Sequence, residues 1–264
     1  IHHFIADKFV VSNSHSLAYA VNAYISMWLK VYYPKEYYTE LLNFSQPNEL
    51  NGFIKQAKLS NVAFEDFKMC KTSNNFEVDY NTNSIKFGLS IVKGLSAADV
   101  EKINNIKCSN VYELVQYIIE NKVTKRTYEP LCRLKYFDTI FDNPKLLEKL
   151  INDCRKIKKS ENLMGKIDKI VNEGCEDYTK GEHFKFQQQY LQFYIDEHPF
   201  YKLQSTIKEN KEELLDIVKS PSQLVDVDDG KYLLYGIINK TSILKSKKTG
   251  KEYYKFTIED VEQQ

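Results

Sequence analysis

The sequence predicts a mainly α fold with a small β-hairpin near the middle of the chain and a β unit at its C-terminal end. Apolar residues recur at three- and four-residue spacing through most of the chain, as in helices that bury one face. Alternating apolar and polar residues replace this spacing at 76–87 and after residue 231, which predicts strands. At 264 residues the chain can bury a substantial core, and we expect two or three compact units.

The longest apolar helix is predicted near the N-terminus, after a polar turn at residues 11–16. Ser14 or Asn13 would cap this helix, and Pro34 marks its end. Its apolar side chains predict one buried face: Leu17, Val21, Tyr24, Trp28 and Val31. The amides of its first turn, beside His15, could bind an anion such as phosphate. A lone histidine at a helix start is, however, more often a capping or packing residue.

The same spacing predicts a second helix that begins at Pro34 and a series of later helices. These are expected at 47–58, 89–92, 97–106, 111–122, 128–134, 144–157, 163–173, 187–194 and 203–218. Strands at 76–80 and 85–87 are expected to form the central hairpin. The C-terminal strands are expected at 232–238, 241–245 and 253–258, with a glycine-containing turn at 247–251.

Two bends between helices are candidate phosphate-binding sites. In the first bend, Lys93, Gly94 and Ser96 separate two predicted helices, and the glycine can take a positive φ and let backbone amides approach a phosphate. Such contacts hold a duplex regardless of its base sequence. A helix C-cap glycine is an equally common reason for Gly94. In the second bend, Lys125 and Arg126 start a helix and could grip phosphate, although adjacent charges are more commonly a solvated pair.

The predicted C-terminal hairpin interleaves basic and aromatic residues, a pattern that suits single-stranded nucleic acid through phosphate pairing and base stacking. The candidate residues are Lys245, Lys247, Lys248, Lys251 and Tyr253. A hairpin with a basic, solvated tip is the alternative, and the residues alone do not separate the two.

Composition excludes several function classes. With 37 basic and 36 acidic residues the net charge is +1, so any contact with DNA must come from local patches rather than from a global field. The five cysteines are widely spaced and lack a Cys-x-x-Cys pair, which argues against a zinc ribbon and a disulfide framework and favours a reducing cytosol. No signal peptide or long apolar run is found, so we expect a cytoplasmic protein without a membrane span.

The N-terminal segment resembles the fingers motif of the bacterial and phage DNA polymerase III alpha subunit, a family C replicative DNA polymerase. In that family a Phe-Asn-Lys-Ser-His-Ser/Ala turn leads into Ala-Tyr-Ala, then Trp-Leu-Lys and Tyr-Pro. The residues that match in register are Ser14, His15, Ser16, Ala18, Tyr19, Ala20, Tyr24, Trp28, Leu29, Lys30, Tyr33 and Pro34. Asn13 stands at the family's lysine, which removes a positive charge from the face expected to meet DNA or nucleotide.

Further segments are similar to the same family in the same order. Residues 85–95 resemble its Arg-Phe-Gly-Leu…Lys-Gly-Val-Gly helix-hairpin-helix, and residues 124–138 resemble a second such hairpin. Residues 193–200 are similar to its Phe-Tyr-Leu-Ser-Gly-His-Pro-Leu element, and residues 232–260 resemble the first strands of its OB domain. This resemblance implies a fingers-like helical segment (1–60), a β-hairpin with a tandem helix-hairpin-helix domain (61–140), a helical connector (141–220) and a partial OB-fold (225–264).

The resemblance implies the DNA-binding portion of a replicative DNA-directed DNA polymerase. It assigns Ser14, His15 and Lys30 to nucleotide binding, the two bends to the duplex, and the C-terminal hairpin to single-stranded template. The expected partners are primer-template DNA and the part of the polymerase that contains the palm. The palm aspartates that bind Mg²⁺ would lie upstream of Ile1, so we expect a fragment or split-gene product that binds no cofactor and is inactive alone.

Two points limit this interpretation. No peptide of the form Gln-x-x-Leu/Met-Phe occurs between residues 143 and 189, so binding to a sliding clamp is not supported. The acidic segment 226–229 reads as a solvated loop rather than as a metal site. The alternative function is a separately encoded, non-catalytic helical DNA-binding or scaffold subunit of a replisome; a purely structural helical protein would leave the ordered motifs unexplained.

Overall fold

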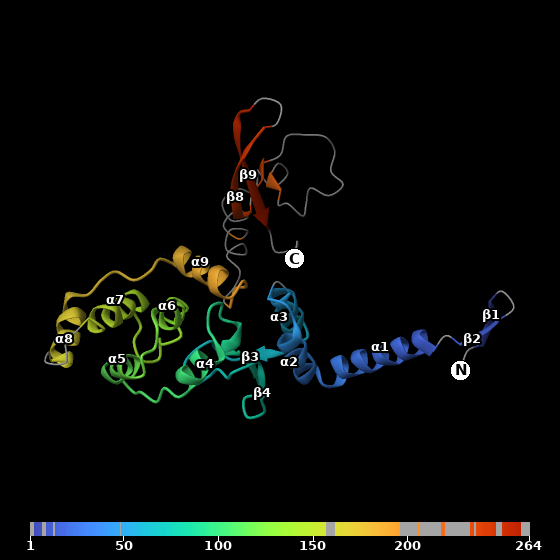
Figure 1. Ribbon diagram of the computed structural model, residues 1–264, viewed down its shortest axis with the longest axis horizontal. Coiled ribbons are helices and arrows are strands. Elements are labelled where there is room, and N and C mark those ends of the chain that lie inside the picture. The colour runs from blue at the N-terminus through green and yellow to red at the C-terminus, as the bar shows by residue number, and fades with distance from the viewer. Residues whose placement is uncertain are drawn as a thin grey trace. The chain divides into compact units, whose positions relative to one another are not determined.

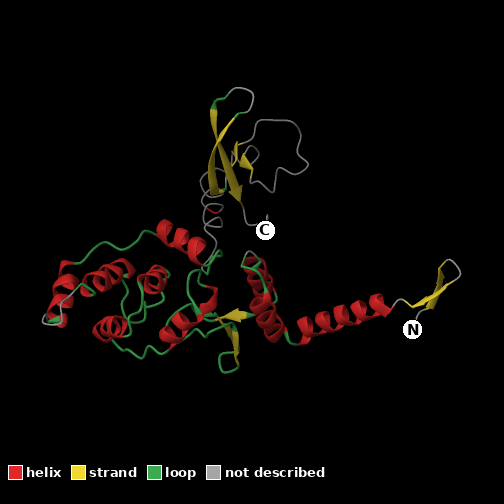
Figure 2. Cartoon of the chain, viewed as in Figure 1, coloured by secondary structure: helices red, strands yellow, loops and turns green. Residues whose placement is uncertain are grey.

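The computed structural model divides the chain into two compact units, Ile1–Phe193 and Tyr194–Gln264 (Figures 1 and 2). The described residues are 3–6, 9–12, 14–47, 49–156, 162–195, 205, 218–219, 233–234, 236–246 and 250–259. The described part of the chain is mainly helical with small sheets, as the sequence predicts. Among the described helices, none combines the length and the apolar character that a membrane span needs.

The N-terminal region contains a short hairpin and three helices. Strands β1 (His3–Ala6) and β2 (Phe9–Ser12) pair antiparallel, so part of the expected polar turn is a strand. They precede the helices α1 (Ser14–Tyr32), α2 (Pro34–Phe44) and α3 (Leu50–Leu59). Pro34 takes the first helical position of α2, as expected from its fixed φ.

The predicted buried face of α1 is exposed in this chain. Tyr24 and Val31 expose 71% and 66% of their surface, and even Trp28 exposes 42%. The main packing partner of α1 among the described elements is α2, which follows it directly, and no other described element covers its apolar stripe extensively. The periodicity therefore predicted the helix correctly, but the expectation that its apolar face is covered was wrong for these residues.

The central hairpin is confirmed and belongs to a slightly larger sheet. Strands β4 (Glu77–Asp79) and β5 (Ser84–Lys86) pair antiparallel, with Val78 opposite Ile85. A third strand, β3 (Ala63–Phe64), adds to β5 in parallel and was not predicted. Directly after β5, Phe87 is buried at the centre of an aromatic cluster formed with Phe64, Phe67, Phe76 and Phe193.

The rest of the first unit is a series of short helices. They are η1 (Leu89–Ile91), α4 (Ala97–Asn104), α5 (Val111–Glu120), α6 (Lys125–Arg133), α7 (Pro144–Cys154), α8 (Leu163–Glu173) and α9 (Lys180–Tyr190). The expected bounds of α8 are confirmed. Helix α9 begins earlier than predicted because Thr179 and Glu182 form a capping box, and it ends before Tyr194 with Gln192 at a positive φ of 66°.

A buried ion pair joins α6, α7 and α9. The guanidinium of Arg133 donates two hydrogen bonds to the carboxylate of Glu148, at 2.9 and 3.1 Å, and a third to the Tyr190 hydroxyl at 3.0 Å. The Tyr178 hydroxyl also donates to Glu148, at 2.8 Å. Because both oxygens of the buried Glu148 carboxylate accept hydrogen bonds, this ion pair fixes the packing of the three helices.

The described part of the second unit consists of two separate strand pairs. Strands β6 (Val218–Lys219) and β7 (Leu233–Leu234) pair in parallel, while β8 (Ile237–Lys245) and β9 (Glu252–Glu259) form an antiparallel hairpin. The hairpin agrees with prediction; of its expected turn, Gly250 has a φ of +68°, while residues 247–249 lie outside the described residues. Residue 218 is in a strand rather than in the expected helix 203–218, most of which lies outside the described residues. An OB-fold has five strands, so the partial OB-fold stays a prediction.

Candidate nucleic-acid interface

Two bends of similar construction precede α4 and α6. The first bend (residues 92–96) has Gly94 at a φ of +101°, and the second bend (residues 121–124) has Lys122 at +50°. Each positive-φ residue is followed by an apolar residue and then by the N-cap of the next helix, Ser96 or Thr124. The sequence analysis identified Gly94 but missed Lys122, because a left-handed lysine in place of glycine or asparagine gives no turn signal.

The structure brings the first bend into contact with the start of α6, the helix that follows the second bend. A Cβ added at Gly94 would lie 3.6 Å from the Nε of Arg126, so the arginine side chain covers the glycine of the other bend. The predicted residues Gly94 and Arg126 therefore lie side by side, although 32 positions separate them in the sequence. The φ of +101° at Gly94, which residues other than glycine rarely adopt, is what requires glycine here.

Backbone donors are available at both helix starts. The amides of Ala97 and Ala98 in α4, and those of Lys125 and Arg126 in α6, have no hydrogen-bond acceptor within the part of the chain that the structure describes. First-turn amides of this kind carry the positive end of the helix dipole and suit an anion. The amide of Lys93, a predicted DNA-binding residue, is not available in this way, because it donates to the Tyr190 carbonyl at 2.8 Å.

A chain of hydrogen bonds, which we call the relay, links the two helix starts. The amide and hydroxyl of Ser96 donate to Oδ2 of Asp99, at 3.0 and 2.6 Å. Oδ1 of Asp99 accepts from the Thr127 hydroxyl at 2.8 Å, and Thr127 Oγ1 lies 2.9 Å from Thr124 Oγ1. The hydrogen bonds from Ser96, with a smaller contribution from Thr127, hold the pKa of Asp99 below its ordinary value against the opposing effect of burial.

The side-chain charges at the bends differ in their availability. Lys93, Lys122 and Arg126 are exposed, and none of them has an ion-pair partner among the described residues. Lys125 is exposed too, but its ammonium lies 3.5 Å from the Glu129 carboxylate, which also pairs with Arg133. Three cations, including the unpredicted Lys122, are therefore available at the surface of the bends.

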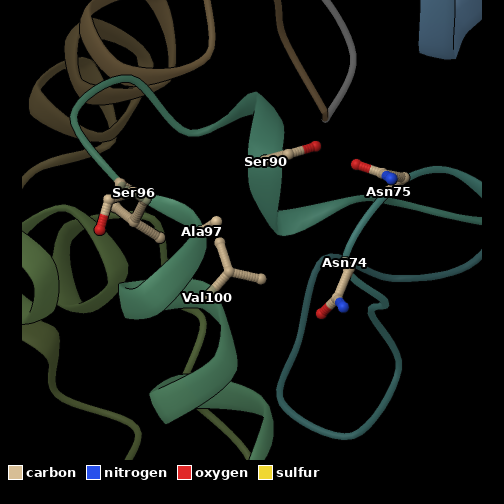
Figure 3. A pocket seen from close by; sticks show the side chains of 7 residues that line it. Asn74, Asn75, Ser90, Ser96, Ala97 and Val100 are labelled. Atoms are coloured by element: carbon tan, nitrogen blue, oxygen red, sulfur yellow. The ribbon is translucent and has the colours of Figure 1, made fainter.

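A small cavity of about 270 Å³ opens beside the start of α4. Its lining residues are Asn74, Asn75, Ser90, Leu95, Ser96, Ala97 and Val100. Figure 3 shows the side chains of Asn75 and Ser90 pointing toward one another, from segments that the sequence analysis did not connect with the bend. The cavity adds amide and hydroxyl groups to the surface beside the first bend.

The predicted nucleotide-binding residues lie at opposite ends of α1. Ser14 and His15 begin the helix, while Lys30 lies in its last turn with its ammonium 5.6 Å from the centre of the Tyr38 ring. Fifteen residues separate His15 from Lys30, which corresponds to about 22 Å along a helix. The structure therefore does not bring Lys30 together with Ser14 and His15.

The predicted residues of the C-terminal hairpin are divided between its two faces. Tyr253 pairs with Leu244, while Lys245 pairs with Glu252, the residue before Tyr253 in β9, so Tyr253 and Lys245 point to opposite faces. Lys245 also forms an ion pair with Glu252 at 3.4 Å, which reduces its availability. Lys251 is exposed beside this pair, and Lys247 and Lys248 lie outside the described residues.

An aromatic pair that the site prediction omitted lies on the hairpin. The rings of Tyr254 and Phe256 lie almost parallel, with centroids 6.3 Å apart and an interplanar angle of 13°, and both side chains are exposed. Their two-residue spacing places them on one face of β9, the face of Lys245. Period-two spacing of the aromatic residues was the signal that could have identified the pair.

Comparison with known proteins relates the chain to one class of DNA polymerase. It is 24% identical over 245 residues to the DNA polymerase III subunit alpha of Aquifex aeolicus, covering 89% of this chain and 20% of that protein. With the same subunit of Campylobacter jejuni the identity is 23% over 272 residues, or 94% and 22% of the two chains. An error-prone DNA polymerase of Vibrio vulnificus is 29% identical over 140 residues, covering 49% of this chain and 13% of that protein.

These relatives confirm the resemblance to the DNA polymerase III alpha subunit. No protein-family model matches the chain. The chain spans about a fifth of the length of the alpha subunits that it matches.

Proposed function

We propose that this chain, similar to one segment of the DNA polymerase III alpha subunit, is the DNA-binding part of a replicative DNA-directed DNA polymerase. In this proposal the two bends are a tandem helix-hairpin-helix that grips the backbone of the primer-template duplex. The chain contributes to template-directed nucleotidyl transfer by holding DNA, and it does not transfer nucleotides alone.

The contact between Gly94 and Arg126 is the observation that carries the proposal. A bend whose glycine lacks a side chain lies in contact there with a guanidinium, next to helix starts whose first-turn amides have no acceptor among the described residues. A phosphate bound there would accept hydrogen bonds from the amides and pair with the guanidinium. Neither contact reads a base, which is what a polymerase that copies every sequence requires.

The remaining predicted roles complete the proposal. Ser14, His15 and Lys30 serve the incoming nucleotide, with Lys30 acting at a separate point because it lies a helix length away. The C-terminal hairpin, as the start of an OB-fold, holds single-stranded template through Lys245, Lys247, Lys248, Lys251 and Tyr253.

The metal chemistry is assigned to a partner rather than to this chain. The described residues contain no group of three or more His, Cys, Asp or Glu side chains that could hold a metal ion. From the resemblance to the DNA polymerase III alpha subunit, we assign the Mg²⁺ ions to the carboxylates of a palm-containing part of the polymerase.

The test is equilibrium binding of the 264-residue chain to a primed duplex as a function of salt concentration. If Lys93, Lys122 and Arg126 each contact one phosphate, the slope of log K against log salt is about −2.7, because each neutralised phosphate contributes about −0.9. Arg126→Ala is expected to reduce the slope by about 1. The matched control is Lys169→Ala, an exposed cation on α8 whose removal leaves the slope unchanged. A flat salt response, or equal slopes for Arg126→Ala and the native chain, contradicts the proposal.

The alternative is a separately encoded, non-catalytic DNA-binding or scaffold subunit. The near-neutral charge and the absence of a metal-binding cluster among the described residues are compatible with either function. The genomic sequence upstream separates them: a continuous or adjacent reading frame with paired palm aspartates favours the polymerase, and a stop codon with no palm nearby favours the separate subunit.

A further inference from the structure

Thr127 is a buried polar residue at the junction of the two bends. It is fully buried in the first turn of α6, and its hydroxyl donates to Asp99 Oδ1. A hydroxyl has one proton, so the hydroxyl of Thr124 must be the donor in the 2.9 Å contact with Thr127 Oγ1. The direction of the relay is therefore fixed, from Thr124 through Thr127 to Asp99.

The Thr124 side chain is used differently from the N-cap side chains of α4, α5 and α9. The side chains of Ser96, Asn110 and Thr179 each accept a hydrogen bond from an amide in the first turn of their own helix. Within the described part of the chain Thr124 accepts no such bond, and its hydroxyl contacts Thr127. The relay thus ties α6 to Asp99 and leaves the first-turn amides of α6 without a side-chain acceptor.

Other packing between α4 and α6 is sparse. Helix α6 packs mainly against α7 and α9, and the principal neighbour of α4 is η1. The relay is therefore one of the main direct connections between the starts of α4 and α6, the helices that follow the two bends. A hydrogen bond between buried groups also fixes orientation, which apolar contact does less strictly.

We propose that Thr127 is a positioning residue that holds the first and second bends in register for a single DNA backbone, without touching DNA itself. This inference rests on the proposed function. It predicts that loss of the Thr127 hydroxyl lets the bends move relative to one another while every phosphate-binding group remains present.

Thr127→Val is the direct test, because valine keeps the shape and burial and removes the hydroxyl. If the bends are aligned in about one variant molecule in ten, the apparent Kd for duplex rises about tenfold, since only the competent fraction binds. The slope of log K against log salt stays at the native value, because no phosphate contact is lost. Thr127→Ser, which restores the hydroxyl, is expected to recover most of the affinity.

Thr39→Val is the matched control. Thr39 in α2 is also buried, but its hydroxyl has no hydrogen-bond partner among the described residues, so the same chemical change breaks no bond found there. Its Kd is expected to stay within twofold of the native value. A Thr127→Val variant whose Kd also stays within twofold of the native value overturns the inference. A Thr127→Val variant whose salt slope falls as in Arg126→Ala overturns it too, because that result would mean that a direct phosphate contact was lost.

Asp99→Ala is a second test of the relay, for which charge and positioning predict opposite changes in affinity. It replaces the first test if Thr127→Val does not fold. Removing a negative charge beside a DNA-binding surface should tighten binding if charge alone matters. If Asp99 acts through the relay, affinity falls instead, and tighter binding overturns the inference. Failure of the proposed function is distinguishable, because in that case the native chain and Arg126→Ala show no salt-dependent binding at all.

Discussion

The buried carboxyl group of Asp138 makes a quantitative prediction about pH. Asp138 lies in the turn after α6, and its buried Oδ1 atom has no hydrogen-bond partner in the described part of the chain. Burial raises the pKa of Asp138 to about 6, with smaller contributions of the same sign from Asp177 and Asp142 and opposing ones from Lys135 and Lys68. The native state therefore holds a proton on this group more tightly than the unfolded chain does.

The sign and size of the effect follow from this difference. An aspartate in an unfolded chain has a pKa of about 3.9, so the native value is higher by about 2 units, which corresponds to at most ~3 kcal/mol. The stabilisation is complete below about pH 4 and is lost as the pH rises through about 6. At neutral pH the native state must hold a half-buried, unpartnered charge.

Asp138→Asn removes that charge at nearly constant shape. At pH 7.5 we expect the free energy of unfolding to rise by about 1–3 kcal/mol, and at pH 4.5 we expect a much smaller difference between the variant and the native chain. The assay is urea denaturation followed by circular dichroism at half-unit steps of pH. Glu101→Gln, an exposed carboxylate on α4, is the control and should show no such trend. A difference that is independent of pH, or an asparagine variant that is less stable at pH 7.5, would refute the reasoning.

Three further predictions concern packing and can be checked by urea unfolding. A Cβ at Gly88 would lie 2.5 Å from a backbone carbon, so Gly88→Ala should lower the free energy of unfolding by about 3 kcal/mol. A Cβ at Gly52 in α3 would meet nothing within 4 Å, so Gly52→Ala should raise the free energy of unfolding by about 0.5–1 kcal/mol through its higher helix propensity. Equal effects of the two would contradict this account. Arg133→Lys leaves the buried Glu148 without its two-pronged partner and should cost about 3 kcal/mol. Lys149→Ala, in an exposed pair 3.8 Å long, should cost below about 0.5 kcal/mol.

Local rules predicted the elements that depend on local sequence. The helix at 163–173 and both predicted hairpins are found because apolar periodicity and turn residues specify them within a few positions. The short strands β1 and β3 were missed because neither was recognised beside a turn-rich segment of the kind that joins β4 to β5. The start of α9 was readable from its capping box, and its misplacement was a failure to use that signal.

Long-range relations were not predictable in the same way. Gly94 and Arg126 were identified singly, but their contact, like the hydrogen bond between Asp99 and Thr127, joins residues about 30 positions apart in the sequence. Periodicity tells which face of a helix is apolar and not what covers it, which is why the exposure of α1 was missed. Lys122 gave no signal because its left-handed conformation is a property of the fold rather than of its residue type.

The distribution of ion pairs explains how a chain of net charge +1 can present a local basic surface. Several cations away from the bends are neutralised by carboxylates: Lys71, Lys86, Arg133, Lys149 and Lys245. At the bends, Lys93, Lys122 and Arg126 have no such partner among the described residues. With a Debye length of about 8 Å at physiological salt, a distant phosphate would meet a nearly neutral molecule and a close one would meet three unpaired cations. Contact rather than long-range attraction should therefore control binding, so salt is expected to alter the dissociation rate more than the association rate.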